Sequence, residues 1–221
     1  MNGPVTQMLD PSALGIVVLG TALATMARGG FGDLRTAAVA IAHLWRRDFD
    51  EVANRSSLAR ALSLIKRHGP LSAEVQLPPD SALAKMLDQF MRSGEKQDIH
   101  AAHSSHRSVR EARRARAIRT FESAGELAPV FGLVGTLFAI TQIAPDTTGS
   151  SAGAVMNAVA TAVLSTLYGV LLGHLICLPL ARAIERKGEQ EECARERLLD
   201  WIDAQLDEPA DRPLKSVKDA A

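Results

Sequence analysis

Three long runs of apolar residues set the pattern along the chain. Residues 13–27 carry no charged side chain, and residues 128–181 hold one acid, Asp146, and no Lys or Arg. A turn rich in Pro, Gly and Ser over residues 145–151 divides the second stretch into two runs. Polar residues do not recur there at every third or fourth position, as they would in a buried soluble hairpin. The pattern therefore predicts three membrane-spanning helices.

The first run is short for a spanning helix, because residues 11–27 only just reach the roughly 17 to 25 residues that a crossing needs. A secretory signal peptide is the alternative, since Ala22, Leu23 and Ala24 resemble a small-residue cleavage site. A signal peptide begins with a positive segment, but no Lys or Arg precedes this run. We therefore interpret it as a membrane anchor.

The charges beside the runs predict an orientation. Arg28 and Arg35 follow the first run and Arg182 and Arg186 follow the third, whereas the turn between the second and third holds only Asp146. The positive-inside rule then places the N-terminus outside and the C-terminus inside. The expected segments are a periplasmic N-terminus (1–11), a spanning helix (12–28), a cytoplasmic helical domain (29–122), a channel helix (123–145), a periplasmic turn (146–153), a second channel helix (154–183), a cytoplasmic helix (184–207) and a tail expected to be disordered (208–221).

The remaining sequence is typical of helices. Aromatic residues make up 4% of the chain and β-branched residues do not alternate, which disfavours an all-β fold. Apolar residues at helical spacing predict helices over 33–45, 50–67 and 81–91, the last capped by Asp80 or Ser81. A longer helix is expected from about residue 98 into the second run. The predicted fold class is an all-α membrane protein with a helical cytoplasmic domain between its first and second spans.

The helix that leads into the second apolar run is rich in basic residues. Its arginines are Arg107, Arg110, Arg113, Arg114, Arg116 and Arg119. No aromatic residues interleave for base stacking, so we do not expect nucleic-acid binding. Their place beside a span favours an orienting role and contact with anionic lipid headgroups. The acids of the helix after the third run are interpreted as a solvated or partner-facing surface.

The sequence contains no arrangement of residues that is typical of a catalytic site. We find no Ser/His/Asp arrangement, phosphate-binding glycine loop or metal-ligand spacing, so no enzyme activity, cofactor or metal is expected. His100, His103 and His106 stand at three-residue steps, and we interpret them as a solvated face rather than a metal site. Cys177 and Cys193 provide neither a disulfide framework nor a zinc cluster.

The second and third runs contain small, hydroxyl and helix-bending residues. The small ones, which permit close helix packing, are Gly132, Gly135, Gly169 and Gly173. Pro129 and Pro179 each free a backbone carbonyl and can kink a helix. The hydroxyls are Thr136, Thr141, Thr161, Ser165, Thr166 and Tyr168. Each alone can simply bond a carbonyl of its own helix, but together they indicate a polar seam. This seam holds no carboxylate, so ion conduction would need an acid from another chain.

These runs resemble a known family. Residues 124–143 (AGELAPVFGLVGTLFAITQI) and 156–187 (MNAVATAVLSTLYGVLLGHLICLPLARAIERK) resemble the paired channel helices of the MotA/TolQ/ExbB proton-channel family, and more closely those of its MotA side. The features that carry the resemblance are AP-x-FG-x-x-GT, and then TLYG followed by LPLA. Upstream, DPSALGIVVLGTALATM and FGDLRTAAVAI are similar to the second spanning helix of MotA and its exit.

The resemblance implies a pentamer of this subunit around a dimer of a single-span partner of MotB, ExbD or TolR type, in the bacterial inner membrane. The partner's intramembrane aspartate would bind the coupling ion, a proton or sodium ion, and ion flow would turn the ring. Thr136 and Thr166 match the hydroxyls that line the family's ion path. Pro129 and Pro179 match the prolines that couple ion passage to movement.

Three further residues, Arg67, Glu74 and His174, bear on the role of the chain. SLIKRHGPLSAE resembles the segment of MotA that touches the flagellar rotor, so Arg67 and Glu74 match the charged pair that engages it. The alternative for this pair is an ordinary solvated contact. His174 stands where the family usually has an uncharged residue. It could titrate beside Thr166, or be a neutral histidine bonded across a helix interface.

Two departures from MotA remain. MotA has four spanning helices, and this sequence begins where the second would begin, so its three-span topology is that of ExbB and TolQ. Ser93 stands where the cytoplasmic loop usually has an aspartate. The expected function is a channel subunit, for protons, of a MotA-like stator that converts ion-motive force into mechanical work. The alternatives are a TolQ/ExbB-like transducer for envelope transport or integrity, and a non-conducting membrane scaffold.

Overall fold

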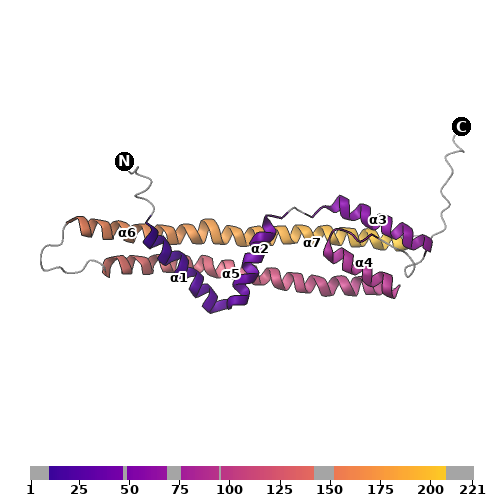
Figure 1. The fold of residues 1–221 in the computed structure, drawn as a ribbon, viewed down its shortest axis with the longest axis horizontal. Helices are drawn as coiled ribbons and strands as arrows, with labels where there is room; N and C mark the ends of the chain where they lie inside the picture. The colour runs from indigo at the N-terminus through magenta and orange to yellow at the C-terminus, as the bar shows by residue number, and fades with distance from the viewer. Residues whose placement is uncertain (1–9, 47–48, 69–75, 95, 142–151, 208–221) are drawn as a thin grey trace, which may run out of the picture. The chain divides into compact units, whose positions relative to one another are not determined.

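The computed structural model describes residues 10–46, 49–68, 76–94, 96–141 and 152–207, and these contain helices and no strand. Figure 1 shows the helices in chain order. They are α1 (Pro11–Gly29), α2 (Phe31–Leu44), α3 (Glu51–His68), α4 (Ser81–Ser93), α5 (Lys96–Thr141), α6 (Ala152–Leu171), the π-helix η2 (Leu172–Cys177) and α7 (Leu178–Asp207). The predicted all-helical class is confirmed.

Within the part of the chain that the structure describes, three helices are long and apolar enough to cross a membrane, as the apolar runs predicted. They are α1, α5 and the helix that runs from α6 through η2 into α7. Each contains an 18-residue window that is apolar and holds at most two charged residues. The orientation of these helices across a membrane stays a prediction.

Two compact units divide the chain. The first comprises residues 1–46 and 112–187, and the second comprises residues 47–111 and 188–221. The first therefore holds α1, α2, α5 from residue 112 onward, α6, η2 and the start of α7. The second holds α3, α4 and the remaining ends of α5 and α7.

In the first unit, α1 and α2 meet at a sharp turn. Gly30 has a φ of 85°, a conformation that favours glycine, and its N–H donates to the carbonyl of Met26 at 2.7 Å. The Nζ atom of Lys187 donates to the carbonyls of Leu44 and Arg46, at 3.3 and 2.9 Å. A cation at a helix C-terminus is favourable, so α7 stabilises the end of α2.

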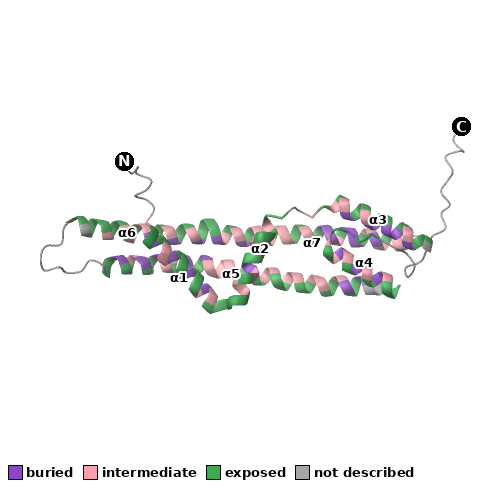
Figure 2. Ribbon diagram, in the orientation of Figure 1, coloured by how far each residue is buried: buried purple, intermediate pink, exposed green. Residues whose placement is uncertain are grey.

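The second unit has the apolar core. Residues of α3 and α4 that recur at helical spacing pack with residues from the ends of α5 and α7, and Figure 2 shows buried positions along α3, α4 and the C-terminal part of α7. The core consists of Leu58, Ala61, Leu62, Ile65, Leu83, Met86, Leu87, Phe90, Ile99, Ala102, Leu198, Leu199 and Ile202. Asp80 caps α4 by accepting the N–H groups of Ala82 and Leu83 at 3.0 Å, as one of the two predicted caps.

The third apolar run is not one regular α-helix. The N–H of Leu178 donates to the carbonyl of Gly173, five residues earlier, so η2 has π-helical bonding. Pro179 follows directly and has no N–H with which to restore the α-helical pattern. The sequence predicted a kink at Pro179 but not the extra residue in the turn before it.

Candidate functional site

A close seam joins α5 to α6 and η2 within the first unit. We call it the α5–α6 seam, and its members are Gly125, Gly132, Gly135, Ser165, Gly169 and Gly173. A Cβ added to Gly169 would lie 2.6 Å from the carbonyl oxygen of Ala128, and one added to Gly173 would lie 2.6 Å from that of Gly125. Such distances leave no room for a side chain, so backbone packs on backbone here.

Ser165 is the hydroxyl that crosses this seam. Its side chain is fully buried, and its Oγ lies 3.1 Å from the carbonyl oxygen of Gly132 on α5 and 2.9 Å from that of Ala162 on its own helix. The sequence placed Ser165 among several hydroxyls without distinguishing it. Only the register of α5 against α6 reveals which hydroxyl bonds across the two helices.

The two predicted ion-path hydroxyls are partly exposed at the edges of the seam. Thr136 Oγ1 donates to the carbonyl of Leu133 at 2.6 Å, and Thr166 Oγ1 lies 3.4 Å from that of Ala162. Each donates within its own helix, so its oxygen lone pairs remain able to accept a proton donor or solvate a cation. The Cα of Thr166 lies 3.1 Å from where a Cβ on Gly132 would stand, which places Thr166 directly beside α5.

The irregular segments of the two helices touch. Pro129 lies inside α5 and has no N–H for the carbonyl of Gly125, four residues earlier. Gly173 of η2 packs on that carbonyl, and a Cβ added to Gly173 would also lie 3.3 Å from the Pro129 ring. Pro129 is thus brought together with η2, the segment that leads into Pro179.

His174 lies in η2 with an exposed side chain. Its Nδ1 lies 3.3 Å from the carbonyl oxygen of Val170, one turn earlier on the same helix. This contact lies within its own helix, whereas one of the two alternatives predicted from the sequence was a bond across a helix interface. A titrating role for His174 stays a prediction.

Asp10 is a carboxylate that the sequence reasoning missed. It caps α1 by accepting the N–H of Ser12 at 3.0 Å, and its other oxygen accepts the hydroxyl of Thr161 on α6 at 2.8 Å. The Asp10 N–H also lies 3.3 Å from the hydroxyl oxygen of Tyr168. Hydrogen bonds from the Ser12 and Thr161 side chains hold the pKa of Asp10 below its usual range. The signal available in the sequence was an Asp-Pro pair opening an apolar run.

Charged side chains form a buried network in the second unit. Arg195 of α7 is buried and lies 2.9 Å from a carboxylate oxygen of Asp80 and 3.4 Å from Glu191 and Glu192. Glu192 also accepts from Arg110 of α5 at 2.8 Å. Burial raises the pKa of Asp80, but the Arg195 bond and charge outweigh it and the pKa lies below its usual range.

The structure adds to one interpretation from the sequence of this network and contradicts another. Arg107 and Arg110 pair with Glu196 and Glu192 of α7, and contact of this helix with anionic lipid stays a prediction. His103 is largely buried rather than solvated, with its Nε2 3.3 Å from a Glu192 oxygen. Glu191, Glu192 and Glu196 of the last helix thus have partners within the chain. The reason lies in the tertiary structure. Arg110 and Glu192 are 82 positions apart in sequence but form a pair in space, and no local charge pattern reveals such a pair.

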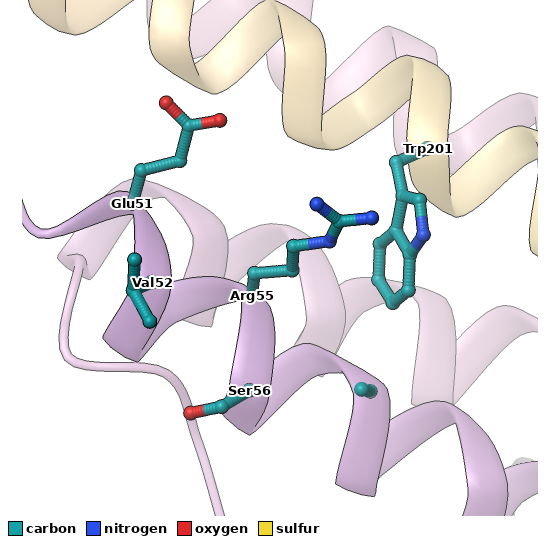
Figure 3. Close-up of a pocket in the computed structure, with 6 residues that line it drawn as sticks. Glu51, Val52, Arg55, Ser56 and Trp201 are labelled. Carbon is teal, nitrogen blue, oxygen red and sulfur yellow. The ribbon is translucent and has the colours of Figure 1, made fainter.

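The second unit also carries the predicted rotor contact and a shallow pocket. Arg67 is exposed in the last turn of α3, and Glu74 lies outside the described residues. The pocket lies between α3 and α7, where the Arg55 guanidinium stands 5.2 Å from the centre of the Trp201 ring (Figure 3). Its lining of Glu51, Val52, Ser56 and these two residues holds no set of groups typical of catalysis. Among the described residues, no three His, Cys, Asp or Glu side chains are grouped to hold a metal.

Comparisons with a family model and with known proteins give consistent results. Residues 74–197 match the model of the MotA/TolQ/ExbB proton channel family. Motility protein A of Aquifex aeolicus (strain VF5) is 23% identical over 210 residues, which cover 92% of this chain and 81% of the relative. Chemotaxis protein PomA of Vibrio alginolyticus is 23% identical over 206 residues, covering 91% and 79%.

A solved structure has the same fold. The flagellar MotAB stator complex from Bacillus subtilis contains a chain that matches with a TM-score of 0.73 and 20% identity, over 92% of this chain and 81% of that one. Since the family model spans more than half of its residues, this chain belongs to the MotA/TolQ/ExbB proton channel family.

Proposed function

We propose that the chain is the ion-channel subunit of a MotA-like stator, and that it converts a flow of protons into mechanical work. The observation that carries the proposal is the α5–α6 seam, a close helix pair flanked by the hydroxyls of Thr136 and Thr166. Hydroxyls in an apolar span can solvate a passing ion while remaining bonded to their own helix. The relatives named for motility favour the stator role over the envelope-transducing one.

A partner must supply the acid. Between Leu127 and Ala183 the sequence holds one carboxylate, Asp146, in the segment between the two helices. A proton or sodium path within a membrane needs an ionisable group. We infer a single-span partner of MotB type with an intramembrane aspartate, in line with the MotAB complex in the similar structure.

The assembly we infer is a homo-oligomer, a pentamer, in the bacterial inner membrane. Large apolar side chains on α5 and α6 are exposed in the single chain, among them Leu137, Phe138 and Val163. Water is a poor solvent for such faces, so lipid, neighbouring copies and the partner are their suitable surroundings. In this arrangement Pro129, Pro179 and the π-helix between them would couple ion passage to movement of α5 against α6.

The test is ion flux through the reconstituted complex. The chain and its one-span partner are placed in vesicles, and proton entry is followed with a pH-sensitive dye under an imposed membrane potential, with a sodium arm beside it. Thr136→Val and Thr166→Val should each abolish flux while assembly persists. Thr25→Val is the matched control, because Thr25 is buried in α1 and bonds only its own helix.

The outcomes separate the alternatives. Absence of flux from the wild-type complex would make the chain a scaffold. Flux that persists in both Val variants would remove Thr136 and Thr166 from the path. Flux without any effect on swimming when the gene is deleted would favour a TolQ/ExbB-like transducer. Loss of flux when the partner's aspartate becomes asparagine would support the shared path.

A further inference from the structure

We infer that Ser165 is a positioning residue for the ion path: its hydroxyl fixes Thr136 of one helix relative to Thr166 of the other. The inference deepens the proposed function and rests on it. Its basis is a single bond across the α5–α6 seam, from Ser165 Oγ to the carbonyl oxygen of Gly132 at 3.1 Å.

The bond acts on Thr136 through a shared acceptor. In an α-helix the N–H of each residue donates to the carbonyl four residues earlier, so the Gly132 carbonyl belongs to the turn that ends at Thr136. A second donor on this carbonyl comes from α6 and ties that turn of α5 to α6. The register between the helices at the height of Thr136 is therefore set by Ser165.

The same residue also sets Thr166. Ser165 directly precedes it, and both their backbones pack on Gly132, whose added Cβ would lie 2.9 Å from the Ser165 carbonyl oxygen and 3.1 Å from the Thr166 Cα. One hydroxyl thus links the peptide that carries Thr166 to the turn that carries Thr136.

The surroundings of Ser165 hold its side chain in place. A Cβ added to Gly135 would lie 2.7 Å from the Ser165 Cβ, so the glycine provides the space that the serine occupies. The hydroxyl has one proton, which is shared between the Gly132 carbonyl at 3.1 Å and the Ala162 carbonyl at 2.9 Å, and the residue has no exposed surface. A fully buried side chain in a backbone-lined space has few alternative rotamers, which makes it a suitable spacer between two helices.

The first experiment measures flux per assembled complex in the vesicle assay for Ser165→Ala. We expect a decrease of about threefold, in keeping with the average strength of hydrogen bonds between membrane helices. Ser165→Cys, which keeps a weaker donor, should fall between alanine and serine. Thr25→Ala is the control and should leave flux unchanged, because it removes a buried hydroxyl that bonds only within α1. Should Ser165→Ala fail to accumulate, Ser165→Cys carries this test alone.

The second experiment reports on Thr136 and needs neither the partner nor ion flux. In the chain with Cys177→Ala and Cys193→Ser, the thiol of Thr136→Cys is alkylated with and without Ser165→Ala. Loss of the tether should speed its reaction about threefold, while the thiol of Val130→Cys, on an exposed position of α5, should react at an unchanged rate. Equal rates at position 136, or equal flux per complex in Ser165→Ala, would overturn the inference. Failure of the proposed function would instead show as absent flux in the wild type, with the thiol result intact.

Discussion

The guanidinium of Arg195 lies 2.9 Å from the carboxylate of Asp80, and this pair ties α7 to the first turn of α4. Both side chains are largely buried, at 9% and 12% exposure. Asp80 is also the N-cap of α4, and its own N–H donates to the Asn54 side chain of α3 at 3.0 Å. A single residue therefore connects three helices of the second unit.

Removing the cation from this pair should be strongly destabilising. Arg195→Met keeps an unbranched apolar side chain but leaves Asp80 buried without its counter-charge. Breaking a buried pair on one side costs about 3 to 5 kcal/mol. The measurement is the free energy of unfolding of the full chain in detergent, by denaturant titration of its helical signal.

The control for Arg195 is a pair of the same kind on the surface. Arg92 lies 3.1 Å from Asp88 on α4, with 79% of its side chain exposed. An exposed pair one turn apart contributes about 0.3 to 0.5 kcal/mol, so Arg92→Met should change stability little. Equal losses in the two variants would mean that burial of Arg195 contributes nothing to the second unit.

The pair should also make stability depend on acid. The pKa of Asp80 is lowered in the folded chain, whereas an unfolded aspartate titrates near about 3.9. The stabilisation is therefore complete above about pH 4 to 5 and is lost as the pH falls through the lower folded pKa. Asp80→Asn keeps a capping side chain but cannot titrate. The stability difference between wild type and Asp80→Asn should be constant near neutral pH and shrink below about pH 4; a constant difference throughout would contradict the assignment.

The glycines of the α5–α6 seam give a prediction of steric origin. Gly169→Ala would place a methyl group 2.6 Å from the Ala128 carbonyl oxygen and 3.0 Å from the Gly132 Cα, both backbone atoms that cannot turn aside. The helices must separate, so flux per complex and thermal stability should both fall. Gly15→Ala is the matched control, because nothing lies within 4 Å of an added Cβ there and alanine favours a helix. Similar behaviour of the two variants would remove close packing as the role of Gly169.

Apolar patterning predicted the helices well, because the membrane runs and the second unit's core both follow local periodicity. Asp80 as a cap and the end of α3 at His68 were equally visible in short stretches of sequence. The π-helix was not, since the turn depends on how Gly173 packs against Gly125 as well as on Pro179.

The candidate site, like the fold, could be predicted only in part from the sequence. The glycines and hydroxyls were visible as a pattern, but which hydroxyl crosses between helices depends on a register that no single segment encodes. Asp10 meets Thr161 across 151 positions of sequence, whereas the local pattern predicts only that it belongs to a periplasmic N-terminus. Buried charges such as Glu192 look like a solvated helix face until the pairing helix is known.

The last prediction concerns the surface that a partner would touch. Arg67 is exposed at the end of α3, so its charge is available to a docking protein. An ordinary exposed pair of Arg67 with Glu74 would contribute at most about 1 kcal/mol, and its loss would have little effect on stability. Charge reversal at a docking surface acts differently, because like charges repel and weaken binding.

Arg67→Glu and Glu74→Lys should each impair swimming in the native host without lowering the amount of protein, and an opposite reversal on the partner should restore it. Lys66→Glu is the matched control, since Lys66 is also exposed on α3 but points about 100° away around the helix, and it makes the same change in net charge. A docking role requires that Arg67→Glu be much more harmful than Lys66→Glu. Normal swimming in both Arg67→Glu and Glu74→Lys would end the rotor assignment and favour envelope work, because a TolQ/ExbB-like transducer has no rotor for these charges to meet. The channel helices would be unaffected by that result, since none of these three residues lies in the α5–α6 seam.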